Sequence, residues 1–199
     1  MSMNSFSRIC VYCAASDGIN GEYLAGASAL GGEIARRGYG LVYGGGSVGL
    51  MGAVARGAAA GGGNVHGIIP AALTPKEISG PPIGVLEIVD SMHTRKARMA
   101  ELSDAFIALP GGFGTLEELF ETITWTQLGI HRKPIGLLNI AGFYDPLLAL
   151  IEHSIVQGFV RPQYRALLVA ERDPATLLDR LLVHESPDGI VRWITPEQV

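Results

Sequence analysis

The sequence predicts an α/β fold built on a doubly wound parallel sheet with helices on both faces. Short apolar runs typical of buried strands alternate with segments of helical periodicity along all 199 residues. Two of these runs lead directly into glycine-rich turns that open helices, an arrangement found at the carboxyl edge of such sheets. No internal repeat or linker-like stretch breaks the alternation, so we expect residues 1–199 to form a single domain.

The expected strands are short apolar runs bounded by glycine, proline or polar residues. They cover residues 8–15, 39–43, 64–69, 85–89, 105–109, 134–139 and 167–170. The expected helices have apolar residues at three- and four-residue spacing. They cover residues 22–37, 50–60, 92–102, a segment from 115 to about 127, 145–156 and 174–182. Residues 70–84 form a loop with four prolines, which is long for a connection and therefore a candidate functional segment.

Composition and charge exclude several classes of protein. The formal net charge of −4 disfavours a surface that binds nucleic acid, because such surfaces are basic. No apolar run reaches the roughly 18 residues that a membrane-spanning helix needs. Residues 1–8 contain no apolar core of a signal peptide. We therefore expect a soluble cytoplasmic protein with neither nucleic acid nor membrane as a partner.

The cysteines and histidines indicate no redox or metal site. Cys10 and Cys13 lie three residues apart in the first expected strand, where they point to opposite faces. We expect both thiols to be buried rather than to form a redox pair. The five histidines show no metal-ligand spacing. The sequence thus predicts no metal and no cofactor.

A strand, a glycine turn and a helix start follow one another within residues 105–118. Pro110 ends the strand because it has no N–H to donate. Three glycines, which leave the backbone open to a ligand, come next: Gly111, Gly112 and Gly114. Thr115 and Glu118 have the spacing of a capping box, with Thr115 as the N-cap. The free N–H groups and the positive end of the helix dipole predict a phosphate site here.

A second glycine turn follows the strand at 39–43, with its glycines at Gly44, Gly45, Gly46 and Gly49. The spacing matches the dinucleotide fingerprint, but no acidic residue lies between Ala53 and Thr74 to hold a ribose. No lysine follows as in a Walker A loop. Since both turns follow parallel strands, we expect them to meet at one edge as phosphate loops of a single mononucleotide site. A purely structural tight turn is the alternative.

Arg95 interrupts an otherwise apolar helix stripe. Met92, Met99 and Leu102 share its face at helical spacing, whereas Arg98 lies off this face and is expected in solvent. An inward arginine needs an anionic partner, because burying an unpaired charge is costly. The partner is either an anionic ligand or an unidentified carboxylate. The remaining alternative is an edge position with the head group in water.

The segments Ser91-Met-His-Thr-Arg-Lys-Ala-Arg-Met99 and Leu109-Pro-Gly-Gly-Phe-Gly-Thr-Leu-Glu-Glu118 occur in one chain. Together they closely resemble the Lonely Guy family of cytokinin riboside 5′-monophosphate phosphoribohydrolases, many of which carry the label lysine decarboxylase. The resemblance extends from Ile9 to about Val160. It implies a Rossmann-like homodimer that hydrolyses the N-glycosidic bond of an N6-substituted AMP, releasing the free base and ribose 5-phosphate.

The resemblance also implies roles for particular residues. It places Arg95 and Glu118 in the catalytic roles. The substrate contacts that it implies are Glu77, Arg95, Lys96, Gly112, Phe113, Gly114, Thr115, Leu116, Glu117, Glu118 and Thr124. The chain departs from the family after the first strand, where Ala14 replaces a glycine present in many members.

The residues themselves leave some roles open. Near a helix N-terminus Glu118 should stay ionised, which suits a general base or an electrostatic stabiliser of an oxocarbenium-like state. Completing the helix cap is its alternative role. Arg95 can hold either the phosphate or the sugar. Two other functions compete: pyridoxal-dependent decarboxylation, which needs one of Lys76, Lys96 or Lys133, and a non-catalytic mononucleotide-binding module.

Overall fold

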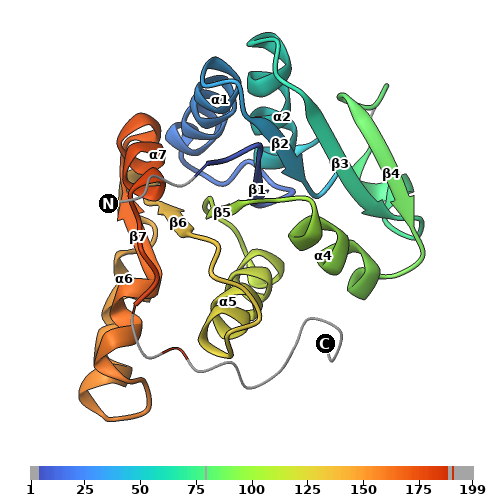
Figure 1. Cartoon of the computed structure of the whole chain (residues 1–199). Coiled ribbons are helices and arrows are strands. Elements are labelled where there is room, and N and C mark those ends of the chain that lie inside the picture. Colours follow the sequence, from blue (N-terminus) through green and yellow to red (C-terminus); the bar gives the residue numbers. More distant parts are fainter. Residues whose placement is uncertain (1–4, 79, 188–189, 191–199) are drawn as a thin grey trace.

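Seven strands form one sheet in the order β4-β3-β2-β1-β5-β6-β7 (Figure 1). The computed structural model describes residues 5–78, 80–187 and 190. The strands are β1 (Arg8–Tyr12), β2 (Gly40–Tyr43), β3 (Val65–Pro70), β4 (Val85–Val89), β5 (Ala105–Ala108), β6 (Ile135–Leu138) and β7 (Leu168–Glu171). Every neighbouring pair is parallel. The predicted doubly wound sheet is confirmed.

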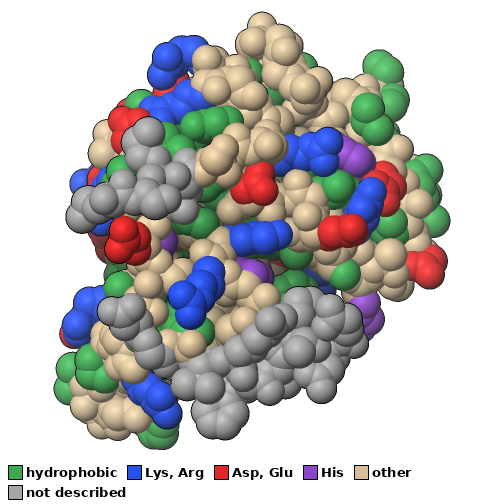
Figure 2. Space-filling model, in the orientation of Figure 1, with side chains coloured by type: hydrophobic (Ala, Val, Ile, Leu, Met, Phe, Trp, Pro, Cys, Tyr) green, Lys and Arg blue, Asp and Glu red, His purple; other side chains and the backbone are tan. Residues whose placement is uncertain are grey.

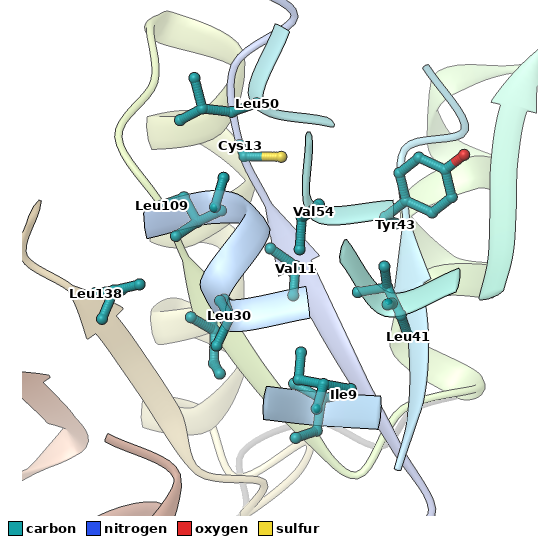
Figure 3. Close-up of a cluster of buried hydrophobic side chains, with 14 of the residues drawn as sticks. Ile9, Val11, Cys13, Leu30, Leu41, Tyr43, Leu50, Val54, Leu109 and Leu138 are labelled. Atoms are coloured by element: carbon teal, nitrogen blue, oxygen red, sulfur yellow. The ribbon is translucent and has the colours of Figure 1, made fainter. Parts of the chain in front are cut away.

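Helices cover both faces of the sheet (Figure 1). One face carries α1 (Gly21–Arg36), α2 (Gly49–Ala60) and α7 (Pro174–Leu182). The other carries α4 (Met92–Glu101), α5 (Phe113–Gln127) and α6 (Asp145–Val156). Figure 3 shows the core beneath the first group, where Leu30 and Val54 from the helices meet Ile9 and Val11 of β1. Because β1 and β5 are buried on both faces, their sequences read as continuous apolar runs.

Several helices begin at a polar side chain that satisfies a free backbone N–H. Asn20 accepts from Glu22 N at the start of α1, Ser91 from Thr94 N at α4, and Asp173 from Thr176 N at α7. Such caps fix where a helix starts. The cap at Ser91 fixes where α4 begins and thus the direction in which Arg95 points.

Three details of the fold differ from the expectation. The first strand ends at Tyr12 rather than at residue 15, so residues 13–16 form a loop at the carboxyl edge. The proline-rich loop contains a short helix, α3 (Thr74–Glu77). Two 3₁₀ helices, η1 (Ile140–Gly142) and η2 (Pro162–Leu167), flank α6. Pro162 at the first position of η2 and Pro75 in the first turn of α3 favour these helix starts, since the fixed φ of proline suits the first turn of a helix.

The prediction for the cysteines is confirmed. Cys10 and Cys13 are both buried and both free thiols. Cys10 belongs to the core beneath α4 and α5, whereas Cys13 belongs to the core beneath α1 and α2. Their opposite directions follow from the two-residue period of a strand.

In the described part of the chain, none of the helices is long and apolar enough to cross a membrane. Figure 2 shows acidic and basic side chains interspersed on the side of the molecule that faces the viewer in Figure 1.

The strand order places a topological switch point between β1 and β5. The chain leaves β1 through α1 to β2 on one side, and later returns through α4 to β5 on the other. Ligands of open α/β sheets bind at the carboxyl ends of such strands. At this point Ala14 N donates to the carbonyl oxygen of Pro110 over 3.3 Å, which joins the two loops.

Candidate active site

A cavity of about 480 Å³ opens at this switch point. Its walls come from the loop after β1, the loop between β3 and β4, and the first turns of α2, α4 and α5. The residues that line it are Cys13, Ala14, Ala15, Ser16, Met51, Leu73, Glu77, Met92, Arg95, Gly112, Gly114, Thr115, Glu117 and Glu118. Segments far apart in the sequence therefore meet at one place, as the alternation of strands and helices predicts.

The glycine turn after β5 forms one end of the cavity. The N-cap of α5 is Gly112, in extended conformation and without a side-chain cap, so the predicted capping box of Thr115 and Glu118 is wrong. A Cβ added at Gly112 or Gly114 would meet nothing within 4 Å. This open backbone and the helix dipole make the first turn of α5 a suitable cradle for an anion.

Glu118 lies in the second turn of α5 and points into the cavity. Its side chain is buried, with 8% of the residue exposed. Burial raises the pKa of Glu118 from 4.5 to about 7, although the positive charge of Arg95 opposes this rise. The expectation of a fully ionised carboxylate is therefore wrong, because desolvation outweighs the helix dipole. A carboxyl group of this pKa can both accept and release a proton near neutral pH.

Arg95 points inward, as its place on the apolar stripe predicts. The residue is 6% exposed, and its Nη2 donates to the carbonyl oxygen of Gly44 over 3.1 Å. Its Nε has no hydrogen-bond partner in the described part of the chain. The sulfur of Met92 lies 3.7 Å from Nη1. Arg95 is thus a wall residue with a buried, unsatisfied donor. Arg98 is partly exposed and pairs with Glu87 and Glu101.

The second glycine turn lies under the cavity rather than in its wall. Gly44, Gly45 and Gly46 are buried, and a Cβ at Gly44 would lie 1.9 Å from Arg95 Nη2. At the start of α2, Leu50 N donates to Ser16 O over 3.3 Å and Met51 N to Ala14 O over 3.2 Å. Gly49 has a φ of +60°, and a Cβ there would meet the backbone of Ala15. This turn makes room for the guanidinium and holds the loop after β1.

Glu77 brings α3 into the site. Its carbonyl oxygen accepts from Ser47 N over 2.8 Å, which fixes α3 against the second glycine turn. Its Oε2 atom is buried with no hydrogen-bond partner among the described residues. Glu77 is therefore a wall residue of the same cavity that carries a buried, unsatisfied acceptor.

Lys96 lies beside the cavity and is already paired. Its Nζ contacts Glu117 Oε1 at 2.6 Å and Glu121 Oε1 at 2.9 Å. Burial lowers the pKa of Lys96, but hydrogen bonds to both carboxylates outweigh burial and raise it. Lys96 is thus charged, and its two ion pairs link α4 to α5 within the single chain.

Besides Lys96, three other predicted contacts do not line this cavity. Phe113 is 93% exposed, and Leu116 packs against the core beneath α5. Thr124 is exposed two turns further along α5, with its hydroxyl donating to Phe120 O over 2.7 Å. Gly111 also lies behind the turn, where a Cβ would lie 2.1 Å from the Thr115 hydroxyl oxygen.

Several residues that line the cavity were not predicted from the sequence as site residues. They are Cys13, Ala14, Ala15, Ser16, Met51, Leu73 and Met92. The rule that ligands bind beyond the carboxyl ends of central strands could have identified the loop after β1. Leu73 gave no such signal, because its position depends on how the loop between β3 and β4 folds over the edge. Met92 lies one turn before Arg95 on the same face of α4, so the helical spacing that placed Arg95 inward could have identified it. Burial keeps the pKa of the Cys13 thiol well above its usual range, so Cys13 is neutral in the wall.

A metal centre finds no support in the described residues, which contain no group of three or more histidine, cysteine, aspartate or glutamate side chains placed to hold an ion.

Comparison with known proteins identifies close relatives. Residues 51–181 match the family described as "possible lysine decarboxylase". The chain is 53% identical over 165 residues to cytokinin riboside 5′-monophosphate phosphoribohydrolase LOG of Oryza sativa subsp. japonica, covering 83% of this chain and 68% of that protein. It is 51% identical over 180 residues to the enzyme LOG7 of Arabidopsis thaliana, covering 90% and 83%.

Solved structures share the fold at lower identity. The molybdenum cofactor carrier protein of Chlamydomonas reinhardtii superimposes with a TM-score of 0.65 at 23% identity, covering 89% of this chain and 98% of that one. The molybdenum cofactor binding protein of Rippkaea orientalis gives a TM-score of 0.64 at 23% identity, covering 88% and 94%. These likenesses support the Rossmann-like architecture.

Proposed function

Because the chain belongs to the family of cytokinin riboside 5′-monophosphate phosphoribohydrolases, we propose that its cavity hydrolyses N6-substituted adenosine 5′-monophosphates. Enzymes of this family release the free base and ribose 5-phosphate. The observation that carries the proposal is the pair of buried Glu118 and Arg95 at one cavity, beside the open first turn of α5.

The first turn of α5 supports a role for the 5′-phosphate. Gly112 and Gly114 leave the backbone open, and the first N–H groups of the helix have no partner within the helix. A phosphate in this position is favoured by the dipole and by direct donors. In this proposal the phosphate binds at α5 and thereby orients the rest of the nucleotide in the cavity.

Glu118 lies one turn further along the same helix, which suits the sugar. Cleavage of the N-glycosidic bond develops positive charge at C1′, and a nearby carboxylate stabilises that charge. The ionised form takes a proton from the attacking water as the bond between C1′ and the base breaks. With a pKa of about 7, Glu118 can then release this proton at neutral pH.

Arg95 keeps Glu118 available in the ionised form. Among the groups around Glu118, the guanidinium of Arg95 contributes the largest effect that lowers its pKa. Without this charge, burial alone would hold Glu118 protonated. Arg95 is therefore assigned two tasks: contact with the substrate through Nε and electrostatic support of Glu118.

A base-release assay tests the proposal. Purified protein is incubated with AMP, with N6-isopentenyl-AMP and with the two matching nucleosides, and free base is measured by chromatography. We expect release from monophosphates and almost none from nucleosides, because the nucleosides lack the group that binds at α5. Equal release from nucleoside and monophosphate would contradict the phosphate site, and no release from any of them would contradict the function.

The lysines argue against pyridoxal-dependent decarboxylation. A Schiff base needs a neutral lysine, but Lys96 is held charged by Glu117 and Glu121. Burial lowers the pKa of Lys133, but its Nζ donates to Ala100 O over 2.7 Å in a separate pocket near Trp125. The side chain of Lys76 lies outside what the structure describes. An absorbance scan for a bound pyridoxal chromophore checks this alternative.

A non-catalytic nucleotide-binding module is disfavoured by the charges in the cavity. Glu77, Glu117 and Glu118 all line it. Carboxylates beside a phosphate weaken its binding, so three of them do not suit a simple binding site. A carboxylate near the sugar is favourable in an enzyme, because it stabilises the positive charge that the reaction develops at C1′.

We also propose that the protein forms a homodimer through α4 and α5. Phe113 and Phe120 are 93% and 42% exposed, and Thr124 faces solvent on the same helix. The implied contact between Thr124 and substrate therefore requires another copy of the chain. Light scattering after size exclusion measures the mass, and Phe120→Asp should dissociate the dimer. The free thiols of Cys10 and Cys13 are compatible with the reducing cytoplasm.

A further inference from the structure

Among the described residues, Met92 is the one exposed methionine. It is 41% exposed, whereas Met51 is 5% and Met99 is 1% exposed. Met1 and Met3 lie outside the described residues. Met92 is also the first residue of α4 and lines the cavity at the switch point. Its thioether is therefore open to small oxidants in solvent, which convert methionine to the sulfoxide.

The sulfur of Met92 contacts the guanidinium of Arg95. Nη1 of Arg95 donates to Met92 Sδ over 3.7 Å, while Nη2 donates to Gly44 O over 3.1 Å. The two side chains are three residues apart and share one face of α4. A thioether sulfur is only a weak acceptor, so the contact at Nη1 restrains the arginine less than the contact at Nη2. A chemical change at this sulfur would act directly on Arg95.

Oxidation of the thioether would make such a change. Hydrogen peroxide transfers one oxygen atom to the sulfur, so that an S–O bond forms, the O–O bond breaks and the peroxide is reduced to water. The side chain becomes polar, and its oxygen accepts hydrogen bonds. A hydrogen bond from a charged guanidinium is stronger than one between neutral groups. Methionine sulfoxide reductases reverse the step, because they reduce the sulfoxide to thioether and water with electrons from a dithiol.

The other oxidisable groups in the cavity wall are protected. Met51 and Cys13 line the cavity but are buried. Burial keeps the pKa of the Cys13 thiol well above its usual range, and a neutral thiol reacts with peroxide much more slowly than a thiolate. Peroxide should therefore react with Met92 before it reacts with either of them.

We propose that Met92 is a site of reversible oxidation, and that its sulfoxide binds Arg95 and thereby inhibits the enzyme. The sulfoxide oxygen accepts from Nη1 and competes with the substrate for the guanidinium. The effect on activity rests on the proposed phosphoribohydrolase function, whereas the site of oxidation does not. Base release would thus slow down under oxidising conditions and recover when the sulfoxide is reduced.

Controlled oxidation tests the proposal. The wild type, Met92→Leu and the control Met99→Leu are incubated with hydrogen peroxide, and catalase ends the reaction at several times. Peptide mass spectrometry measures sulfoxide at Met51, Met92 and Met99 and any oxidation of the thiols. The kcat/KM for N6-isopentenyl-AMP is compared with that of the untreated sample of the same variant. Met99 is a matched control because it lies two turns further along α4 and is buried.

We expect Met92 to be oxidised while Met51 and Met99 remain thioethers. The kcat/KM of the wild type and of Met99→Leu should fall by at least about 10-fold, the order of one hydrogen bond to a charged group, in step with the sulfoxide at Met92. Met92→Leu should keep the activity of its own untreated sample, because leucine has no sulfur to oxidise. Reductases for both sulfoxide epimers, supplied with dithiothreitol, should restore the wild type.

Met92→Gln tests the contact with Arg95 without peroxide. Glutamine has nearly the length of methionine and carries a neutral acceptor oxygen as the sulfoxide does, whereas leucine carries none. We expect Met92→Gln to be at least about 10-fold less active than Met92→Leu. Thermal melts show whether both variants are folded.

Two results of the peroxide experiment would overturn the proposal: oxidation of Met92 no faster than that of Met51 and Met99, or complete sulfoxide at Met92 with unchanged kcat/KM. A folded Met92→Gln variant as active as Met92→Leu would overturn the role of Arg95 in the inhibition. Failure of the wild type to release base from any monophosphate would instead overturn the proposed function, and mass spectrometry would still show which methionine is oxidised.

Discussion

The Nη2 atom of Arg95 donates a hydrogen bond to the carbonyl oxygen of Gly44 over 3.1 Å, which links α4 to the turn after β2. The contact is possible because residue 44 has no side chain: a Cβ there would lie 1.9 Å from the donor. The second glycine turn therefore makes room for the guanidinium of Arg95 and holds it in place.

Gly44→Ala is accordingly expected to reduce activity far more than stability. The added methyl group would displace the end of a flexible side chain, which the fold can accommodate, but the guanidinium would move from its position. A shift of about 1 Å at a reacting group can cost about 100-fold in rate, so we expect a fall of that order in kcat/KM for base release. Gly40→Ala is the control, because its Cβ would meet the flexible side chain of Arg8 at 3.1 Å. Equal activity of both variants would contradict the positioning role.

Arg95→Ala and Arg98→Ala compare how much the inner and the outer face of α4 contribute to activity. Arg95 lines the cavity, whereas Arg98 forms surface ion pairs with Glu87 and Glu101. Removing a positioned electrostatic group costs about 100- to 1000-fold in kcat, and we expect this loss for Arg95→Ala. Arg98→Ala should retain activity with a small change in melting temperature. The reverse ranking in steady-state assays would show that the wrong arginine has been assigned.

Gly114→Ala tests the phosphate cradle. Residue 114 lies in the first turn of α5 with nothing within 4 Å of an added Cβ, so alanine should raise the free energy of unfolding by up to about 1 kcal/mol. The methyl group would occupy the space proposed for the phosphate, so KM for monophosphates should rise at least about 10-fold.

Gly21→Ala supplies the control for that measurement. Residue 21 begins α1, away from the cavity, and its Cβ would also meet nothing within 4 Å. It should show a similar gain in stability with unchanged KM. A Gly114→Ala enzyme with normal KM would place the phosphate elsewhere.

Local periodicity predicted the elements and the direction of Arg95. The alternation of apolar runs and helical stripes identified all seven strands, and the 3.6-residue period placed Arg95 inward. Both features depend on neighbours in sequence. The strand order and the folding of the loop between β3 and β4 depend on distant contacts, so Leu73 was not found as a wall residue.

The two glycine turns show a second limit of sequence reasoning. Their patterns predicted two phosphate loops, but in one of them Leu50 N and Met51 N are already bound to the loop after β1. A glycine pattern shows that another group must come close to the backbone of the turn. It does not show whether that group is a ligand or another part of the protein. In the same way the spacing of Thr115 and Glu118 predicted a cap, whereas Gly112 begins the helix.

The ionisation of Glu118 is the clearest case of a distant effect. The helix dipole, which is local, predicted an ionised carboxylate. The walls from α4 and the loop after β1 remove water from the group, and this desolvation raises its pKa from 4.5 to about 7. Burial of this kind follows from tertiary packing and has no signature in the helix sequence itself.

Glu118→Gln tests whether activity depends on the charge of the Glu118 side chain or only on its packing. Glutamine keeps the shape of the side chain and removes its ionisation. If the ionised form is active, kcat/KM of the wild type should rise with pH through about 7. Turnover of Glu118→Gln should be at least about 100-fold lower and should lose this pH dependence. A wild-type rate that falls as pH rises through 7 would make the protonated carboxyl the active form and Glu118 the proton donor to the leaving base.

The same substitution has a predicted effect on stability. The folded-state pKa of Glu118 is raised above its unfolded value of 4.5, so its contribution is fully present below 4.5 and is lost as pH rises through about 7. Glutamine stays neutral, and Glu118→Gln should therefore be more stable than the wild type above pH 7, by roughly 1–3 kcal/mol. The difference should shrink toward pH 4.5. Denaturant melts at pH 5 and pH 8 measure it, with Glu152→Gln as the surface control. A glutamine variant that gains no stability between these two pH values would mean that burial does not raise this pKa, and the activity profile would then need another titrating group.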